Sequence, residues 1–446
     1  HPDMVALTAS IATDIRLLGH DVLATKAHSR VLLAAGLLTK DDVGAIDEVL
    51  DELTEEWKRG RVVPDPTDED VHSLVERVLT ARLGDVGKRI HAGRSRNDLV
   101  ATDLRLWCRD AAAAMGDDLR ALLDVIAGFG DAQSETLMPG YTHVQRGQPV
   151  SVGFHMLAHG FALLRDLHRF RHAYESADTS ALGAGALAGN TLALDPTVGA
   201  EELRFSRIFD NAMDAVSDRD FIADLLYACA LCSVHLSRLA EELVLWSSSE
   251  FGFVRIADDW STGSSMMQQK RNPDLAELIR GRAAGAVSDL NGLLVLLKGL
   301  PLAYDRDLQE DKEFLFRSFD RTSGAVRGMT GMLGAVRLDK ERLAAAAAGG
   351  SSWATDLAEA LVARGIPFRS AHDVAGKLVA SLEQRGMTLA DATIEDLRAH
   401  HEAFEPGDLG FADPSRSLGA RSSRGGTSPE EVRAQAARLR AAVTDL

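Results

Sequence analysis

Cysteine and aromatic residues are scarce in this chain of 446 residues. Three cysteines cannot build a disulfide framework, so a reduced cytoplasmic location is the default expectation. Cys229 and Cys232 have C-x-x-C spacing, but their apolar surroundings are typical of a helix interior, which favours two small core residues over a redox or metal pair. Aromatic residues make up only 5% of the chain. The abundance of Ala and Leu favours helices over strands.

Long hydrophobic runs and several common site motifs are also missing. Lys298 and Pro301 interrupt the apolar run near residue 300, so no membrane span is predicted. Charged residues within the first thirty positions lead us to expect no signal peptide. The patterns G-x-x-x-x-G-K-[ST] and G-x-S-x-G do not occur, and the glycines over 183–189 lack the dinucleotide-binding spacing. These absences argue against a P-loop enzyme, an α/β-hydrolase and a dinucleotide-binding fold.

Positive charge is in the minority. Lys and Arg total 49 against 66 for Asp and Glu, which leaves a formal charge of −17. This balance argues against nucleic acid or an anionic membrane as the main partner, but it leaves room for local basic sites that bind an anionic substrate. The apolar fraction of 46% excludes a mainly disordered chain, and the length predicts a large core divided among several domains.

The chain does contain extended helical periodicity. Apolar residues recur at steps of three and four over 104–129, 221–246 and 279–300. Each stripe is longer than an ordinary globular helix, and a mean spacing near 3.5 residues is typical of helix bundles. Segments 150–177 and 316–346 have the same character with less regular spacing. We therefore predict an all-α fold built on five long helices, with no segment that alternates like a strand.

The two ends of the chain differ from this centre. Residues 1–94 contain shorter helical stretches interrupted by VVPDPTDED, and residues 347–446 begin within the run AAAAAGGSS and hold several Gly and Pro residues. We predict an N-terminal helical domain over 1–94, a central long-helix bundle over 95–346 and a small C-terminal helical domain over 347–446.

Several short segments are unusually polar for their apolar surroundings. The first, HAGRSRND over 91–98, places two arginines beside Ser95 and Asn97, just before a long helix. Guanidinium groups with short hydrogen-bond donors suit a carboxylate. Taken alone, this segment is more simply a helix start with Asn97 or Asp98 as the N-cap.

Two further segments carry residues suited to proton transfer. In MPGYTHVQRGQP, prolines at both ends predict a rigid loop, and His143 could act as a general acid or base, although a hydrogen-bonded loop histidine is commoner. In GSSMMQQKRNPD, two serines precede Lys270, and Asn272 followed by Pro273 predicts a helix start whose dipole favours negative charge. The simpler alternative here is a surface loop before a well-capped helix.

The remaining polar features are less specific. The segment YDRDLQEDK is densely charged and, by itself, typical of a solvated turn. His155 with His159, and His168 with His172, are spaced i, i+4 and could face a metal ion. Because no acidic third ligand is evident and one helix carries both pairs, we predict packing or solvation and no metal site.

Six ordered segments are far more specific together than any of them alone. They are HAGRSRNDLVATDLRLW, MPGYTHVQRGQPV, GAGALAG, DAVSDRDF, STGSSMMQQKRNPDLAELIRG and YDRDLQEDKE. Together they resemble the argininosuccinate lyase family of the aspartase/fumarase superfamily, over about residues 9–440. The resemblance implies an all-helical three-domain subunit and a homotetramer with a twenty-helix core, in which each active site combines three subunits. It implies no metal or organic cofactor.

The resemblance also implies a reaction, the reversible release of fumarate from an N-succinyl amino acid. The family's base corresponds to Ser264, which must be activated by surrounding donors because a free hydroxyl is a poor base. Lys270 and Asn272 match the pair that stabilises the aci-carboxylate intermediate. His143 matches the proposed general acid for the leaving nitrogen, and Glu277 matches its carboxylate partner.

Substrate contacts are implied in the same way. The residues that resemble those holding the succinyl carboxylates are Ser95, Arg96, Asn97 and Thr142. The residues that resemble those around the amino-acid half are Ser10, Asp14, Tyr304, Gln309 and Lys312. Arg96, Lys270 and Lys312 are therefore expected to form a basic pocket in an otherwise acidic protein.

The sequence departs from the family pattern in places. Gln268 stands where the signature has proline, which loosens the loop backbone. Leu99, Ala92 and Asn190 replace a usual Gln, a usual Thr and a usual Ser or Thr. None of these changes removes a matched catalytic residue, but they leave two alternatives open. One is the same chemistry on another N-succinyl amine, of the ethylenediamine-disuccinate type, and the other is a non-catalytic, crystallin-like protein.

Overall fold

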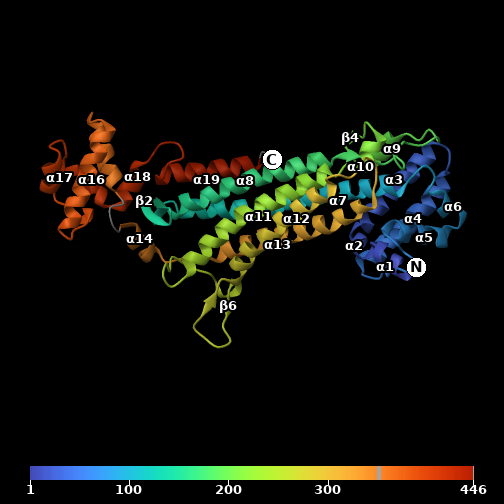
Figure 1. Cartoon of the computed structure of the whole chain (residues 1–446), viewed down its shortest axis with the longest axis horizontal. Coiled ribbons are helices and arrows are strands. Elements are labelled where there is room, and N and C mark those ends of the chain that lie inside the picture. The colour runs from blue at the N-terminus through green and yellow to red at the C-terminus, as the bar shows by residue number, and fades with distance from the viewer. Residues whose placement is uncertain (349–352, 445–446) are drawn as a thin grey trace. The chain divides into compact units, whose positions relative to one another are not determined.

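Helices make up most of the regular structure in the computed structural model, which describes residues 1–348 and 353–444 (Figure 1). Each of the five segments with helical periodicity falls mainly on one long helix, which confirms the predicted all-α class. The long helices are α7 (Arg96–Ala132), α8 (Val152–Ala177), α11 (Asp220–Ser247), α12 (Asp274–Leu297) and α13 (Asp311–Ala335).

Shorter helices occupy the rest of the chain. Before α7 these are α1 (Pro2–Thr8), α2 (Ile11–Asp14), α3 (Leu18–Ala34), α4 (Lys40–Lys58), α5 (Val71–Leu83) and α6 (Asp85–Arg89). Between α8 and α11 these are α9 (Pro196–Glu202) and α10 (Ala212–Ser217). After α13 these are α14 (Lys340–Ala348), α15 (Ala354–Ala363), α16 (Phe368–Gln384), α17 (Ile394–His400), α18 (Pro414–Ala420) and α19 (Pro429–Thr444).

The chain forms two compact units, and the boundary between them falls inside every long helix. The first unit contains residues 1–117, 166–233 and 282–324, and the second contains 118–165, 234–281 and 325–446. Each unit therefore holds a segment of all five long helices. The predicted division at 94/95 and 346/347 is a different partition and stays a prediction. Residues 349–352, within the expected AAAAAGGSS linker, lie outside the described residues.

Polar contacts tie neighbouring long helices together within each unit. In the first unit, the Ser233 hydroxyl of α11 lies 3.1 Å from that of Thr322 in α13, and Arg317 of α13 donates to Asp289 of α12 at 2.6 Å. In the second unit, Arg280 of α12 donates to Glu241 of α11 at 2.6 Å. Most apolar residues of the long helices are buried, as expected for a bundle.

Helix α11 is long and apolar enough to cross a membrane, but its surroundings are those of a core helix. Within the described residues it is the one helix long and apolar enough to cross a membrane, with 56% of its most apolar window buried inside the structure. Its polar side chains bond to neighbouring helices, as Ser233 does to Thr322. These contacts are typical of a helix in the middle of a bundle.

Short strands are present where none was predicted. The longest are β1 (Leu137–Thr142) and β2 (Gln145–Ser151), which form an antiparallel hairpin. The remaining strands have two residues each: β3 (Thr179–Ser180), β4 (Arg207–Ile208), β5 (Val254–Arg255), β6 (Thr262–Gly263), β7 (Arg271–Asn272) and β8 (Arg337–Leu338). The expectation of a chain without strands was wrong at the hairpin because Pro and Gly within it mask the alternation.

The predicted helix over 316–346 is also interrupted. Helix α13 ends at Ala335, β8 follows and pairs with β5, and α14 then begins at Lys340. The Asp339 carboxylate accepts a hydrogen bond from the Arg342 amide at 2.9 Å, and the Asp339 amide donates to the Phe253 carbonyl at 2.9 Å. A local cap and a distant strand pairing thus override a continuous apolar pattern.

Candidate active site

Ser95 begins the helix that carries the first predicted substrate residues. Its hydroxyl accepts a hydrogen bond from the Asn97 amide at 3.3 Å, and its own amide donates to the Asp98 carboxylate at 2.9 Å. Ser95 thus caps the amide of the second helical residue, while the side chain of the third, Asp98, accepts from the Ser95 amide. The expectation that Asn97 or Asp98 is the N-cap was therefore wrong, since Ser95 occupies that position and α7 starts at Arg96.

Asp98 joins this helix start to the glycine-rich segment 183–189. Its second carboxylate oxygen accepts hydrogen bonds from the amides of Gly183 at 3.1 Å and Gly185 at 2.9 Å. Both glycines have positive φ, 103° and 65°, a conformation that glycine adopts without strain. Asn97 adds a bond from its side-chain amide to the Ala186 carbonyl at 2.9 Å. The GAGALAG segment, for which no role was predicted, thus holds Asp98 through its amides.

Burial governs the ionisation of Asp98. Desolvation raises the pKa of its carboxyl group to about 6, although the three main-chain donors work in the opposite direction. The ionised form therefore still predominates at pH 7. A charged, fully bonded carboxylate thus fixes the positions of Ser95 and Asn97.

Replacing Asp98 with alanine is expected to lower the free energy of unfolding by about 3 kcal/mol, because three amides lose their acceptor in a buried place. Chemical denaturation at fixed protein concentration measures this loss. Asp98→Asn keeps one acceptor oxygen for some of these amides, so its free energy of unfolding should lie between those of the wild type and the alanine variant. Equal stability of all three proteins would contradict the anchoring role of Asp98.

Arg96 is already paired within the chain. Its guanidinium donates to Glu69 at 2.9 Å and lies 3.3 Å from Asp70, while Arg306 donates to the other oxygen of Glu69 at 2.5 Å. A substrate carboxylate at Arg96 would have to share the guanidinium with these acids. Lys312 is likewise flanked by carboxylates, those of Asp14 and Asp311. Both of these cations are thus paired with acids of the same chain, and the basic pocket expected around Arg96, Lys270 and Lys312 stays a prediction.

Three residues assigned to the amino-acid half meet in the first unit. The Ser10 hydroxyl donates to Asp14 at 2.5 Å, and the Lys312 amine lies 3.6 Å from the other Asp14 oxygen. Asp14 and Lys312 are both buried. Desolvation raises the pKa of Asp14, while Lys312 and Ser10 oppose that rise. Among the described residues, the Asp14 oxygen that faces Lys312 accepts no hydrogen bond, although it is buried.

Tyr304 and Gln309 lie on the segment just before Lys312. Desolvation raises the pKa of the Tyr304 phenol, and the charge of Lys312 opposes it, so the two side chains interact electrostatically. Gln309 lies in a 3₁₀ helix over Arg306–Glu310 and is half-buried. Tyr304 thus lies on the loop between α12 and this 3₁₀ helix, and Gln309 lies on the turn that leads into α13.

Arg219 and Asp311 form a buried ion pair next to Lys312, and neither residue was predicted to belong to the site. The Arg219 guanidinium donates to Asp311 at 2.6 Å and to the Asp218 carbonyl at 2.8 Å, and both side chains of the ion pair are fully buried. Asp311 lies 3.8 Å from Lys312 and begins α13. The only sequence signal for this pair was the presence of both residues in family-like segments.

His143 lies at the tip of the β1–β2 hairpin rather than in an irregular loop. Thr142 pairs with Gln145 across the turn, and His143 and Val144 between them have φ values of 55° and 58°. Two positive φ values in a two-residue turn define type I′, which is strained for a β-branched residue such as Val144. Thr142 and His143 are both exposed. The hairpin thus presents them to solvent.

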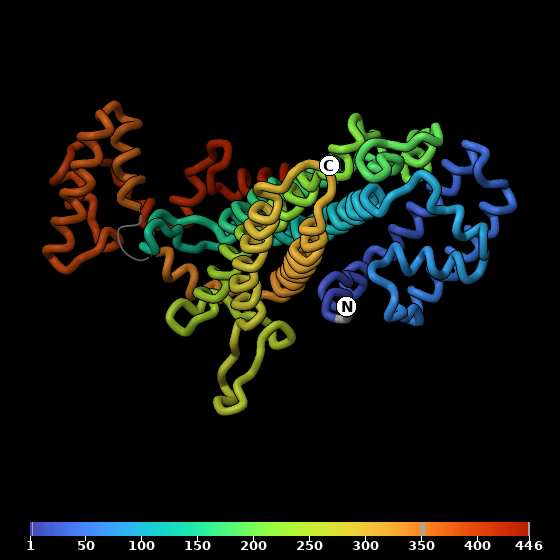
Figure 2. The backbone as a smooth tube through the Cα atoms, turned by 45° about the vertical axis from the view of Figure 1, so that its right-hand side comes forward, coloured from blue at the N-terminus to red at the C-terminus, as the bar shows by residue number. Residues whose placement is uncertain are grey.

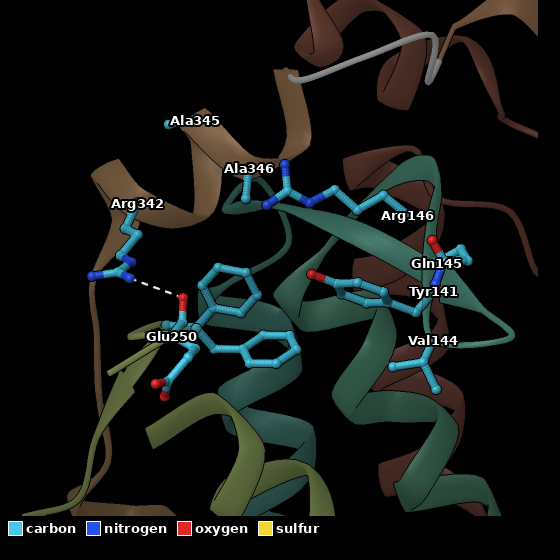
Figure 3. A pocket seen from close by; sticks show the side chains of 10 residues that line it. Tyr141, Val144, Gln145, Arg146, Glu250, Arg342, Ala345 and Ala346 are labelled. Atoms are coloured by element: carbon cyan, nitrogen blue, oxygen red, sulfur yellow. Dashed lines mark hydrogen bonds between the residues drawn. The ribbon is translucent and has the colours of Figure 1, made fainter. Parts of the chain in front are cut away.

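A cavity of about 720 Å³ lies against this hairpin within the second unit. Figure 3 shows Tyr141 and Arg146 directed towards the cavity from the hairpin, with Arg342 of α14 on another wall. Arg342 donates to the Glu250 carbonyl at 2.9 Å, so its guanidinium is partly engaged. None of the predicted site residues lines this cavity, although Val144 directly follows His143 and Gln145 pairs with Thr142 across the hairpin.

Ser264 lies on a loop that projects beyond the adjoining ends of α11 and α12 (Figures 1 and 2). The two strands at its base, β6 and β7, pair antiparallel, with Thr262 opposite Asn272. The Ser264 hydroxyl oxygen accepts hydrogen bonds from the amides of Met266 at 3.3 Å and Met267 at 3.0 Å. Two donors on one hydroxyl oxygen favour negative charge there.

The rest of this loop differs in part from expectation. Asn272 belongs to β7, and α12 begins at Asp274, whose carboxylate accepts the Thr262 hydroxyl. The predicted Asn272 N-cap was therefore wrong, because strand pairing holds that residue. Lys270 and Glu277 are exposed. Among the described residues, no hydrogen bond or ion pair joins His143 to Ser264 or to Glu277.

The predicted site residues are thus divided between the two units. Those in the first unit are Ser10, Asp14, Ser95, Arg96, Asn97, Tyr304, Gln309 and Lys312. Those in the second unit are Thr142, His143, Ser264, Lys270, Asn272 and Glu277. Groups suited to binding carboxylates and amines gather in the first, and the proposed proton-transfer groups lie in the second.

Comparison with known proteins supplies an independent test of the sequence interpretation. Residues 2–287 match the family described as Lyase, and residues 351–418 match the family described as Argininosuccinate lyase C-terminal. An argininosuccinate lyase from Frankia casuarinae is 47% identical over 437 residues, covering 98% of this chain and 94% of that protein. Another, from Acidothermus cellulolyticus, is 47% identical and covers 99% and 91%. A solved structure of EDDS lyase in complex with formate has a TM-score of 0.84 at 26% identity, covering 99% of this chain and 88% of that chain.

Proposed function

Because this chain belongs to the argininosuccinate lyase family, we propose that it catalyses the reversible elimination of fumarate from argininosuccinate to give arginine. The chain is a carbon–nitrogen lyase of the aspartase/fumarase superfamily, as the motifs indicated. The relatives at 47% identity are argininosuccinate lyases, whereas the EDDS lyase is 26% identical. This difference favours argininosuccinate over an ethylenediamine-disuccinate type of substrate.

Ser264 is the base in this proposal. It takes a proton from the succinyl carbon next to a carboxylate, the electrons delocalise into that carboxylate, and the carbon–nitrogen bond then breaks. The main-chain amides of Met266 and Met267 favour the alkoxide form of Ser264, and their contacts are the observation that carries the assignment. Lys270 and Asn272, on the same loop, would stabilise the aci-carboxylate.

His143 and Glu277 are the proposed acid pair. His143 would protonate the leaving nitrogen, and Glu277 would orient and charge its imidazole. Both side chains are exposed in a single chain, and no contact between them occurs among the described residues. We therefore propose that they act in an assembly, where residues from other subunits complete each site.

The proposed substrate contacts match the charges of the side chains, with acids facing the positive part of the substrate and cations facing its carboxylates. Asp14, with Ser10 and Tyr304, would face the positively charged part of the amino-acid half, and Lys312 its carboxylate. Gln309 would add hydrogen bonds beside them. Ser95, Asn97 and Arg96 at the start of α7, with Thr142 of the hairpin, would hold the succinyl carboxylates.

A homotetramer is the proposed assembly. Helix α12 leaves four large aliphatic side chains well exposed in the single chain: Leu278, Val287, Leu294 and Val295. Solvent-facing aliphatic residues on a long helix mark a surface that packs against another helix. A cytoplasmic location, without nucleic-acid or membrane partners, completes the proposal.

The decisive experiment mixes purified protein with argininosuccinate and follows fumarate by its ultraviolet absorbance. We expect fumarate and arginine in equal amounts, with little fumarate from ethylenediamine disuccinate. Fumarate from ethylenediamine disuccinate alone would replace the proposed substrate with the alternative. A folded protein that releases fumarate from neither compound would contradict the enzymatic proposal and favour the crystallin-like alternative.

A further inference from the structure

Two histidines of α8 and one glutamate of α11 converge within the second unit. The Nε2 atoms of His155 and His159 each lie 2.7 Å from the same oxygen, Oε2 of Glu242. The side chains are 22%, 14% and 31% exposed, respectively. These residues lie on the solvent-accessible edge of the helix pair, and none of them belongs to the proposed reaction.

The helices hold the three ligand atoms in a defined geometry. His155 and His159 are four residues apart, so their rings lie one above the other on one face of α8, with centroids 5.7 Å apart. Trp246, one turn beyond Glu242 on α11, packs edge-on against the His155 ring at 5.0 Å. Rigid elements on both sides therefore preset the positions of the donors.

Glu242 also carries the charge that a cation site needs. Its Oε2 atom is an acidic oxygen donor that lies between the two imidazoles, at 2.7 Å from each Nε2 atom. This acid is the third ligand that the spacing of the histidines did not reveal, because it comes from a helix more than eighty residues away.

We propose that His155, His159 and Glu242 bind one divalent transition-metal ion, with zinc as the best match. Two imidazole nitrogens and one carboxylate oxygen are a common protein ligand set for zinc, and the partial exposure leaves a fourth position for water. Zinc-to-ligand distances of about 2.0–2.1 Å in tetrahedral geometry separate the ligand atoms by about 3.3 Å. Each histidine nitrogen now lies 2.7 Å from the Glu242 oxygen, so each of these two distances has to lengthen by about half an ångström, and all three ligand atoms already lie within 4.8 Å of one another.

A direct test measures zinc binding to the full-length protein by competition with a chromophoric chelator. We expect one zinc per chain. The double variant His155→Gln/His159→Gln, and separately Glu242→Gln, should each lower the zinc affinity at least about tenfold. A saturating excess of zinc should raise the melting temperature of the wild type by about 3 °C and leave that of the double variant unchanged.

The second histidine pair of α8 supplies a matched control. His168 and His172 have the same spacing on the same helix but are exposed, so His168→Gln/His172→Gln should leave zinc affinity unchanged. Equal zinc loss in this control, or undiminished binding in the His155/His159 variant, would overturn the proposal. The latter result would point instead to the buried cluster of Asp21, His72 and Asp103.

Cobalt binding tests the site in the wild-type protein, so the outcome does not depend on whether any variant folds. Cobalt bound by nitrogen and oxygen ligands should give visible d–d absorption at one equivalent, without thiolate charge-transfer bands, since all three cysteines are buried. Zinc should displace it. Absence of a saturable cobalt spectrum would contradict the site.

Discussion

Replacing Ser264 with alanine is expected to lower the rate of fumarate release from argininosuccinate about a thousandfold, because proton transfer by a positioned group contributes on the order of 10²–10⁴ in rate. The Ser264 oxygen accepts hydrogen bonds from the amides of Met266 and Met267, and in the alanine variant these donors have no alkoxide base to stabilise. The measurement is steady-state kinetics of fumarate formation, with both kcat and KM determined.

The loop containing Ser264 allows this change without a loss of stability. Its residues from Ser265 to Lys270 are exposed, so water replaces the hydroxyl as acceptor for the two amides. We expect an unchanged melting temperature and a nearly unchanged KM. A fall in kcat at constant KM would place the lost interaction in the transition state rather than in substrate binding.

Ser265 provides the matched control on the same loop. It is exposed, follows Ser264 directly and accepts no comparable pair of amides among the described residues. Ser265→Ala should retain kcat within about threefold, far from the general-base range. Comparable losses in the two variants would show that the loop as a whole, rather than Ser264, limits the reaction.

Replacing Arg219 with methionine is expected to lower the free energy of unfolding by about 3–5 kcal/mol, because it leaves the buried Asp311 carboxylate without its partner. The pair is fully buried, with the guanidinium 2.6 Å from the carboxylate. Methionine fills much of the arginine volume, so lost charge rather than a cavity dominates the effect. Denaturant unfolding at one protein concentration measures the change.

The same variant should also affect substrate binding. Asp311 begins α13 and lies 3.8 Å from Lys312, which approaches Asp14 on its other side. Loss of the Arg219 anchor frees Asp311 to draw Lys312 away from Asp14. We expect KM for argininosuccinate to rise more than kcat falls.

Two further variants separate a buried unpaired charge from general damage. Arg219→Met/Asp311→Leu removes both charges and should recover part of the stability lost in the single variant. Lys88→Met breaks the exposed pair with Asp85 and should leave the unfolding midpoint unchanged. If the double variant lost as much free energy of unfolding as the two single substitutions added together, an unpaired buried charge would not explain the loss in Arg219→Met.

Local periodicity explains why the helices were predictable. The stripes over 104–129, 150–177 and 221–246 correspond closely to α7, α8 and α11, because burial of one helical face requires apolar residues every three or four positions. The argininosuccinate lyase resemblance was carried by residues within short segments, and the comparisons confirm it. These features depend on neighbours in the sequence.

Contacts between distant segments explain what was not predictable. The break after α13 depends on a strand pairing with β5 as well as on the Asp339 cap. The role of the glycines over 183–189 depends on Asp98, about eighty-five residues earlier.

The sequence by itself therefore determined the all-helical class, the family and the identity of the candidate catalytic groups, since all three follow from residue types at short spacing. The tertiary structure decided which charges are compensated. It pairs Arg96 with Glu69, buries Arg219 against Asp311 and brings Glu242 to His155 and His159. Electrostatic energies depend on distance in space and on burial, and neither quantity is encoded in the spacing along one helix.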